Sequence, residues 1–212
     1  MTDKHAVIEQ IRWAFGPNEY PGDAYLLGSN EGCEPFEEVG PFTGRRDWSA
    51  IDAAFLDGHY NALCFFSEAG FRFFLPAYLV ADLEGSLATA DPLFHLTNGF
   101  HDTEVEVPTA TRTFLRKAGG STLMNPRRYG AMTSGDYARY RLSVFTRDEA
   151  AAIVAYLNYR RSTDPHGIHA AAIDAALESY WLDRAAHAPE KASLVRHVAD
   201  EEAFVSAIRR SE

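Results

Sequence analysis

The segment Leu63–Glu84 is the most apolar run of the chain, and it constrains the fold more than any other feature. Ser67 can cap a helix there, and Glu68 stands in the first turn, where the helix dipole favours a carboxylate. Apolar residues occupy nearly every side of this helix, so we expect several neighbours to bury it. Pro76 lies near its centre and removes one backbone hydrogen bond, which predicts a kink or a restart of the helix there.

Periodic apolar residues and capping signals predict further helices along the chain. In the first of them, Val7, Ile11 and Phe15 recur at helical spacing and form an apolar stripe. Residues 18–42 are rich in glycine, proline and glutamate, so we expect mostly loop there, with one helical turn near 35–39. The predicted helices are Asp3–Phe15, Trp48–Phe55 after an Asp47 cap, a short one carrying Leu63 and Cys64, Asp91–Asn98, 147–163 after a Thr146 cap, Ile168–Ala186, and a C-terminal helix at 189–211.

The middle of the chain loses the helical period. Glu104–Val107 and Arg139–Val144 each alternate polar and apolar residues, as strands do, and they predict a small antiparallel unit. Together the patterns predict a mainly α fold: a single-domain helical bundle with a small antiparallel β element between residues 100 and 145. We expect one globular domain over residues 1–212, because a chain of this length can bury roughly 70% of its unfolded surface.

Composition and charge favour a cytoplasmic protein. No apolar run has the length of a signal peptide or of a membrane-spanning helix. Cys33 and Cys64 show no CxxC spacing, so two reduced thiols are expected, with Cys64 in the core. The net charge of −10 opposes binding to nucleic acid or to an anionic membrane.

The charge is unevenly distributed along the chain. Residues 108–147 carry eight basic residues and one acid, a net charge of +7, whereas the rest carries −17. Aromatic residues lie among the arginines, a pattern that can bind phosphate groups or single-stranded nucleic acid. The residues concerned are Arg127, Arg128, Arg139 and Arg141 within the basic segment 112–147. An acidic protein partner, or an electrostatic match to the acidic remainder of the same chain, is the interpretation that the overall charge favours.

Arg72 lies within the apolar helix, where an unpaired charge would be very costly. We expect its side chain either to reach solvent along its flexible stem or to pair with Glu68, four residues before it. A role for Arg72 as the anchor of a bound anion is the functional alternative to this structural one.

Two histidines three residues apart form the best candidate for metal binding. His166 and His169 stand at a loop-to-helix junction, with Asp164 and Asp174 nearby. Imidazole and carboxylate groups are ligands of zinc and manganese, so a metal-assisted hydrolase using His166, His169 and Asp164 is one hypothesis. Surface or capping histidines are the alternative, and the pattern lacks the third ligand at a telling spacing.

Recognised catalytic and nucleotide-binding patterns are absent from the sequence. The run Gly28–Gly32 places its serine wrongly for a nucleophile elbow. The phosphate-binding GxxxxGK[ST] pattern and the dinucleotide-binding GxGxxG pattern do not occur. We therefore expect no cofactor and name no catalytic residue.

The apolar run is similar to the core of a known family. Residues Leu63–Leu79, LCFFSEAGFRFFLPAYL, resemble a bacterial family catalogued as a domain of unknown function, whose members carry an LxFLSxEAFRYFLPAYL pattern. The resemblance covers about residues 4–185, with an IxxIRxAF-type pattern at Ile8–Phe15 and an ALxxYW-type ending at Ala176–Trp181. The LPAYL segment is also similar to the Smi1/Knr4-like superfamily of bacterial immunity and regulatory binding proteins. Neither resemblance implies catalytic residues.

These observations favour a cytoplasmic bacterial protein that binds another protein and has no catalytic activity, of regulatory or immunity type. The metal-assisted hydrolase is the enzymatic alternative. An anion or nucleic-acid binder acting through the basic segment is the third.

Overall fold

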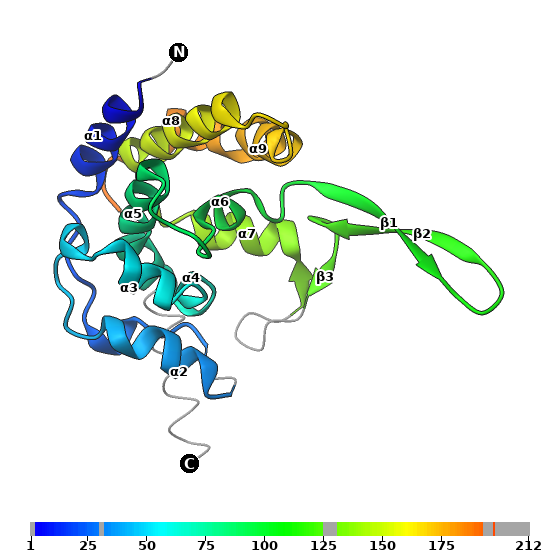
Figure 1. The fold of residues 1–212 in the computed structure, drawn as a ribbon, viewed down its shortest axis with the longest axis horizontal. Helices are drawn as coiled ribbons and strands as arrows, with labels where there is room; N and C mark the ends of the chain where they lie inside the picture. The colour runs from blue at the N-terminus through cyan, green and yellow to red at the C-terminus, as the bar shows by residue number, and fades with distance from the viewer. Residues whose placement is uncertain (1–2, 30–31, 125–130, 193–196, 198–212) are drawn as a thin grey trace.

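The computed structural model describes residues 3–29, 32–124, 131–192 and 197 of the 212-residue chain. In Figure 1 the helices gather into a body from which one long β-hairpin projects. The predicted mainly α fold with a small antiparallel β element is confirmed. The α-helices are α1 (Lys4–Phe15), α2 (Glu34–Val39), α3 (Ala53–Gly58), α4 (Ala62–Phe65), α5 (Glu68–Glu84), α6 (Pro92–Thr97), α7 (Ser134–Leu142), α8 (Arg147–Thr163), α9 (Ala170–Ala176) and α10 (Leu182–His187).

Short turns and strands complete the fold. Strand β1 pairs with β2, and β3 pairs with β4, both antiparallel. The strands are β1 (Asp102–Pro108), β2 (Thr113–Gly119), β3 (Leu123–Met124) and β4 (Met132–Thr133). Single 3₁₀ turns are η1 (Asp23–Tyr25), η2 (Gly40–Phe42) and η3 (Trp48–Ala50), and one π-helical turn, η4 (Leu177–Trp181), joins α9 to α10.

Helix α5 lies at the centre of the body, as its all-round apolarity predicted. It packs against α1, α3, α6 and η3, and thirteen of its seventeen residues are buried. Phe74 contacts Phe42 edge to face at 4.8 Å between ring centroids, and Phe71 contacts Phe145 at 6.1 Å. Aromatic burial of this extent makes α5 the main contributor to the hydrophobic core.

Both ends of α5 are as predicted, and the helix is continuous through its centre. The Ser67 hydroxyl accepts a hydrogen bond from the Gly70 N–H, and Gly85 ends the helix in the left-handed conformation with φ of 73°. Of the two alternatives predicted at Pro76, the restart is wrong, because one uninterrupted helix runs through it, and the kink stays a prediction. Pro76 is itself buried, and tertiary packing can offset the missing backbone hydrogen bond.

The predicted helix Trp48–Phe55 is wrong in its continuity. Asp47 caps only the single turn η3, and Ile51 then takes an extended conformation. Asp52 provides a second cap, its carboxylate accepting from the Phe55 N–H at 2.8 Å, and α3 begins after it. Two aspartates at cap positions therefore divide one apolar pattern into two short elements.

The predicted strand Arg139–Val144 is also wrong, because these residues belong mostly to helix α7. Thr133 caps this helix, since its hydroxyl accepts from the Asp136 N–H at 3.1 Å. The strand Glu104–Val107 is confirmed within β1, but its partner is β2. The Thr-x-x-Asp capping pattern therefore predicts the helix that forms here, whereas the alternation of polar and apolar side chains predicted a strand.

The remaining elements follow the sequence closely. Thr146 and Glu149 form a reciprocal capping box at the start of α8, and α9 to α10 give the helical stretch predicted over Ile168–Ala186.

Cys64 is exposed, so its predicted place in the core is wrong. Most of the C-terminal helix predicted at 189–211 lies outside the described residues, and residues 189–192, which are described, are not helical. Within the described ranges, no helix combines the length and apolarity that crossing a bilayer requires.

A backbone crossing joins the loop after α1 to the α4–α5 junction. Leu27 and Phe66 form an isolated antiparallel bridge, and the Ser67 N–H donates to the Leu26 carbonyl at 2.7 Å. A Cβ atom at Gly28 would lie 2.6 Å from the Phe66 carbonyl oxygen, and one at Gly70 would lie 3.0 Å from the Leu26 carbonyl oxygen. Close backbone approach at this crossing thus needs glycine at position 28, and at position 70 a Cβ would be tight against the Leu26 carbonyl.

Candidate functional site

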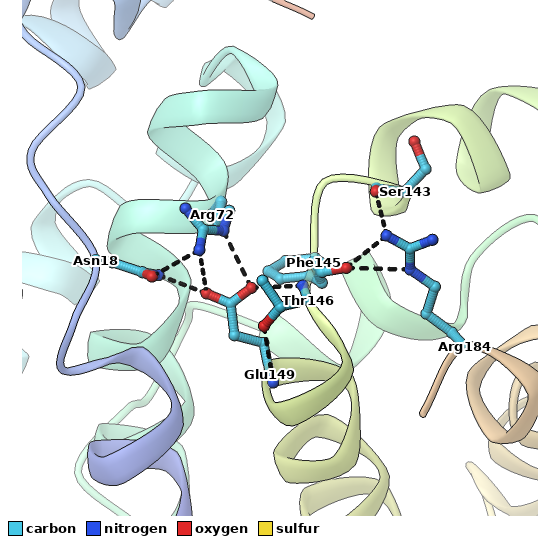
Figure 2. A network of polar contacts seen from close by, with 7 residues as sticks. All are labelled: Asn18, Arg72, Ser143, Phe145, Thr146, Glu149 and Arg184. Atoms are coloured by element: carbon cyan, nitrogen blue, oxygen red, sulfur yellow. Dashed lines mark hydrogen bonds and ion pairs between the residues drawn. The ribbon is translucent and has the colours of Figure 1, made fainter. Parts of the chain in front are cut away.

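Arg72 forms a buried network with Glu149 and Asn18, and not with Glu68 as predicted. Its Nε donates to Glu149 Oε2 at 3.0 Å, its Nη2 lies 2.8 Å from Glu149 Oε1, and Nη2 also donates to Asn18 Oδ1 at 2.7 Å. The Asn18 side-chain N–H₂ group closes the triangle with a 2.7 Å bond to Glu149 Oε1. Figure 2 shows the three side chains converging from α5, α8 and the segment after α1.

This network neutralises Arg72. The Glu149 side chain is 1% exposed, and its Oε2 also accepts the Thr146 backbone N–H at 2.7 Å. A bidentate pair with a buried carboxylate satisfies the guanidinium within the protein. The arrangement joins three segments of the chain, which is the structural role that the sequence predicted, with a different partner.

A second arginine, which the sequence did not single out, supports the same region. Arg184 on α10 donates from Nε to the Phe145 carbonyl at 3.1 Å and from Nη2 to the carbonyls of Phe145 and Ser143. These carbonyls follow the end of α7, where backbone acceptors lack helical partners. Figure 2 places Arg184 on the other side of Phe145 from Glu149.

The predicted basic residues are distributed over different parts of the fold. Arg127 and Arg128 lie outside the described residues. Arg139 and Arg141 are both on α7, and since they are two positions apart they point to different sides of the helix. The Arg139 guanidinium lies 5.5 Å from the Phe100 ring centroid, on the side of the hairpin, and Arg141 points into the body.

Arg141 lies over the core with few polar partners. Its guanidinium carbon is 4.2 Å from the centroid of the Phe71 ring, and its Nη2 donates to the Leu63 carbonyl. Its Nε is buried and has no acceptor within the described part of the chain. A cavity of about 50 Å³ adjoins this side chain between α6 and α7.

The lining of this cavity is mostly polar. His95 and Asn98 come from α6 and its C-terminal end, whereas Ser134 and Tyr137 lie on the same stripe of α7 as Arg141. Burial and the nearby Arg141 charge lower the pKa of His95 to about 3, so this imidazole is neutral at physiological pH.

The hairpin β1–β2 has two different faces. Partners across the ladder lie on the same face, so Val105, Val107, Phe114 and Ala118 share one face with Arg116. The other face carries Glu104 opposite Lys117, together with Asp102, Glu106 and Leu115. Val105 is 45% exposed and Phe114 is 44% exposed. We call the first face the apolar hairpin face.

The His166/His169 pair has a structural explanation. Asp164 Oδ1 accepts the His166 backbone N–H at 3.2 Å, and Oδ2 accepts the His169 backbone N–H at 2.8 Å. These backbone hydrogen bonds lower the pKa of Asp164. Asp174 instead pairs with Arg161, with an Nη2–Oδ2 distance of 2.8 Å. Among residues 3–29, 32–124, 131–192 and 197, no cluster of three His, Cys, Asp or Glu side chains could hold a metal ion.

A surface hollow of about 540 Å³ lies between the end of α1, α5 and the η3–α3 segment. Its acidic residues include Asp47 and Asp52, which are the N-caps of η3 and α3. Helix capping accounts for the position of both carboxylates, and they give this hollow no acid–base pair.

No family model, curated protein or solved structure matches this chain. The family resemblance of residues 63–79 therefore stays a prediction.

Proposed function

We propose that this chain is a non-catalytic protein-binding module whose apolar hairpin face contacts a partner protein. The single observation that carries the proposal is a two-stranded hairpin that projects from the helical body (Figure 1) and gathers Val105, Val107 and Phe114 on one face, whereas Leu115 is the exposed apolar residue of the other, mainly charged face.

The hairpin lacks the packing that usually stabilises such an element. A two-stranded ribbon is marginally stable in water unless a third strand or a helix covers its apolar face. Here β1 and β2 make their contacts mainly with each other, and no third strand joins them in the described part of the chain. A partner surface would bury Val105, Val107 and Phe114, and their burial would favour association.

The charge on this face specifies the chemistry of the partner. Arg116 is the only charged residue of the ladder on the apolar hairpin face. A guanidinium beside apolar side chains suits a partner with an apolar strip and one carboxylate next to it. Such a partner is an acidic protein surface, as the charge distribution of the sequence suggested, and not a nucleic acid.

The proposed setting is the cytoplasm of a bacterium, with a regulatory or immunity role. Cys33 and Cys64 are both free and exposed, which suits a reducing compartment. The bacterial origin and the regulatory or immunity role rest on the family resemblance of Leu63–Leu79.

Photo-crosslinking in native cells tests the proposal. A photoreactive benzoylphenylalanine is placed at Phe114 on the apolar hairpin face, or at Leu115 on the opposite face as the matched control. We expect an adduct with one protein from position 114 and much less from 115. The crosslinked protein is then identified by mass spectrometry, purified, and its Kd for the unmodified chain is measured.

A charge-reversal pair completes this test. Arg116→Glu should weaken the binding of the purified partner at least tenfold, and Lys117→Glu, on the other face, should change the Kd less than threefold. Equal crosslinking from both positions, an adduct with nucleic acid or with a second copy of this chain, or equal effects of the two reversals would contradict the proposal.

A further inference from the structure

We propose that the cavity between α6 and α7 binds a small oxyanion, a carboxylate or phosphate group, through the guanidinium of Arg141. This site is separate from the hairpin; the sequence named Arg141 only as one of four arginines of a basic segment, and the structure adds the cavity and its other residues.

Arg141 differs from Arg72 and Arg160 in its electrostatic pairing, and from Arg184, whose Nε donates to a carbonyl, in having a buried Nε without an acceptor among the described residues. Arg72 pairs with Glu149, and Arg160 pairs with Asp82. Within the residues that the structure describes, Arg141 forms no ion pair with a carboxylate. Its guanidinium contacts the Leu63 carbonyl oxygen and the face of the Phe71 ring. Burying a guanidinium without a counter-ion is costly, so an anion bound beside it would stabilise the fold.

The unused hydrogen-bonding capacity of Arg141 supports the same conclusion. A guanidinium has five N–H groups in a fixed planar arrangement that matches the oxygens of carboxylate and phosphate. One of these groups donates to the Leu63 carbonyl, and the buried Nε has no acceptor among the described residues. The other N–H groups of Arg141 are therefore available to an acceptor that does not belong to the described residues.

The cavity provides further polar groups around the proposed anion. Ser134, Tyr137 and Arg141 recur at helical spacing along α7, and His95 and Asn98 face them from α6. The neutral His95 imidazole can donate one hydrogen bond without adding a second positive charge. The hydroxyl of Ser134 and the amide of Asn98 are donors of the same kind.

The size of the cavity limits the ligand. A volume of about 50 Å³ corresponds to roughly three to five water molecules, at roughly 10–15 Å³ each. A carboxylate or phosphate group has three to five heavy atoms and fits this space, whereas a nucleotide base does not. The ligand is therefore a small anion, or the anionic end of a larger molecule.

Thermal unfolding at constant ionic strength tests the site. Chloride is exchanged stepwise for inorganic phosphate in one series and for acetate in another. We expect one of the two to raise the Tm of the wild-type chain saturably, by about 3–6 °C at ten times its Kd. Preference for phosphate or for acetate decides which oxyanion the site prefers.

Arg139→Gln is the matched control for Arg141→Gln, because both remove one positive charge from the same helix. The oxyanion should still raise the Tm of Arg139→Gln but should no longer raise the Tm of Arg141→Gln. Asn98→Asp places a carboxylate in the cavity, so this variant should be more stable than wild type in chloride and insensitive to the oxyanions. It keeps the test decisive if Arg141→Gln does not fold.

Three results would overturn the proposal: no saturable rise with either oxyanion, the same rise in Arg141→Gln, or a full rise retained in Asn98→Asp. Isothermal titration of wild type with the favoured oxyanion should give one site per chain. The hairpin variants should not change this binding, so failure of the protein-binding proposal and failure of this one are distinguishable.

Discussion

At the scale of single residues, Glu149 takes part in two separate interactions. Its carboxylate completes the capping box of α8 and also neutralises Arg72 on α5. The sequence indicated that Arg72 needs a counter-ion, but it could only suggest a neighbour one helical turn away. Spacing within a helix contains no information about a carboxylate 77 positions along the chain. The capping pattern at Thr146 was the available signal for Glu149.

We expect Glu149→Gln to lower the free energy of unfolding by about 3–5 kcal/mol, because it leaves the Arg72 guanidinium buried without its counter-ion. Urea denaturation measures this change. Arg72→Met combined with Glu149→Gln should cost less than the sum of the two single changes, since both members of the pair are then uncharged.

The exposed pair Arg147–Glu190 provides the control, at an N–O distance of 3.0 Å. Glu190→Gln should cost less than about 1 kcal/mol, as is usual for ion pairs open to solvent. If Glu149→Gln costs no more than Glu190→Gln, the network does not have the structural role assigned to it.

At the scale of secondary-structure elements, the ends of helices were more predictable than their continuity. Asp91 and Thr146 are caps in the structure, as their sequence contexts predicted. Side-chain alternation was misleading at residues 139–144. An alternation over only six residues is a weak signal for a strand. The hydrogen bond that Thr133 accepts as N-cap stabilises a helix that begins before these residues and includes most of them. Tertiary packing around Pro76 was equally invisible in the local sequence.

Gly85 allows a direct test of helix termination. Its φ is 73°, and a Cβ atom added there would meet no atom within 4 Å, so only backbone strain opposes alanine. We expect Gly85→Ala to destabilise the protein by about 1–2 kcal/mol. The midpoint of urea denaturation, at an unchanged m-value, measures the effect.

Gly58 is the matched control at the end of α3. A Cβ there also meets nothing within 4 Å, and its φ is not positive. Gly58→Ala should be neutral or stabilise by up to about 1 kcal/mol, because alanine restricts the unfolded chain. Equal effects of the two substitutions would show that α5 does not end by the left-handed turn.

At the scale of the whole molecule, most apolar residues lie in the buried core, and a smaller group lies on the projecting β1–β2 hairpin, which we call the arm. The core gathers around α5, whereas the hairpin contributes little to it (Figure 1). The sequence predicted the core because its apolar residues are dense and periodic. The hairpin extends much farther than its predicted strand, since the pairing of β1 with β2 depends on residues that the alternation pattern did not include.

This division predicts that the helical body folds without the arm. Thr103 and Ala118 are paired across the ladder, so the residues 104–117 between them can be replaced by Asn-Gly, which favours a two-residue turn. We expect the shortened chain to keep its far-UV circular dichroism in the helical region and a Tm within about 4 °C of wild type. Loss of cooperative unfolding would show instead that the arm belongs to the core.

The glycines at the Leu27–Phe66 crossing have a consequence for related sequences. Gly28 and Gly70 are 42 positions apart, yet each makes room for the backbone that crosses the other's segment. A chain that keeps this crossing must keep Gly28, whereas alanine can replace Gly70 where the Leu26 carbonyl shifts by a few tenths of an ångström. Glycine at position 28 together with glycine or alanine at position 70 would therefore identify distant relatives of this architecture more reliably than any single apolar segment.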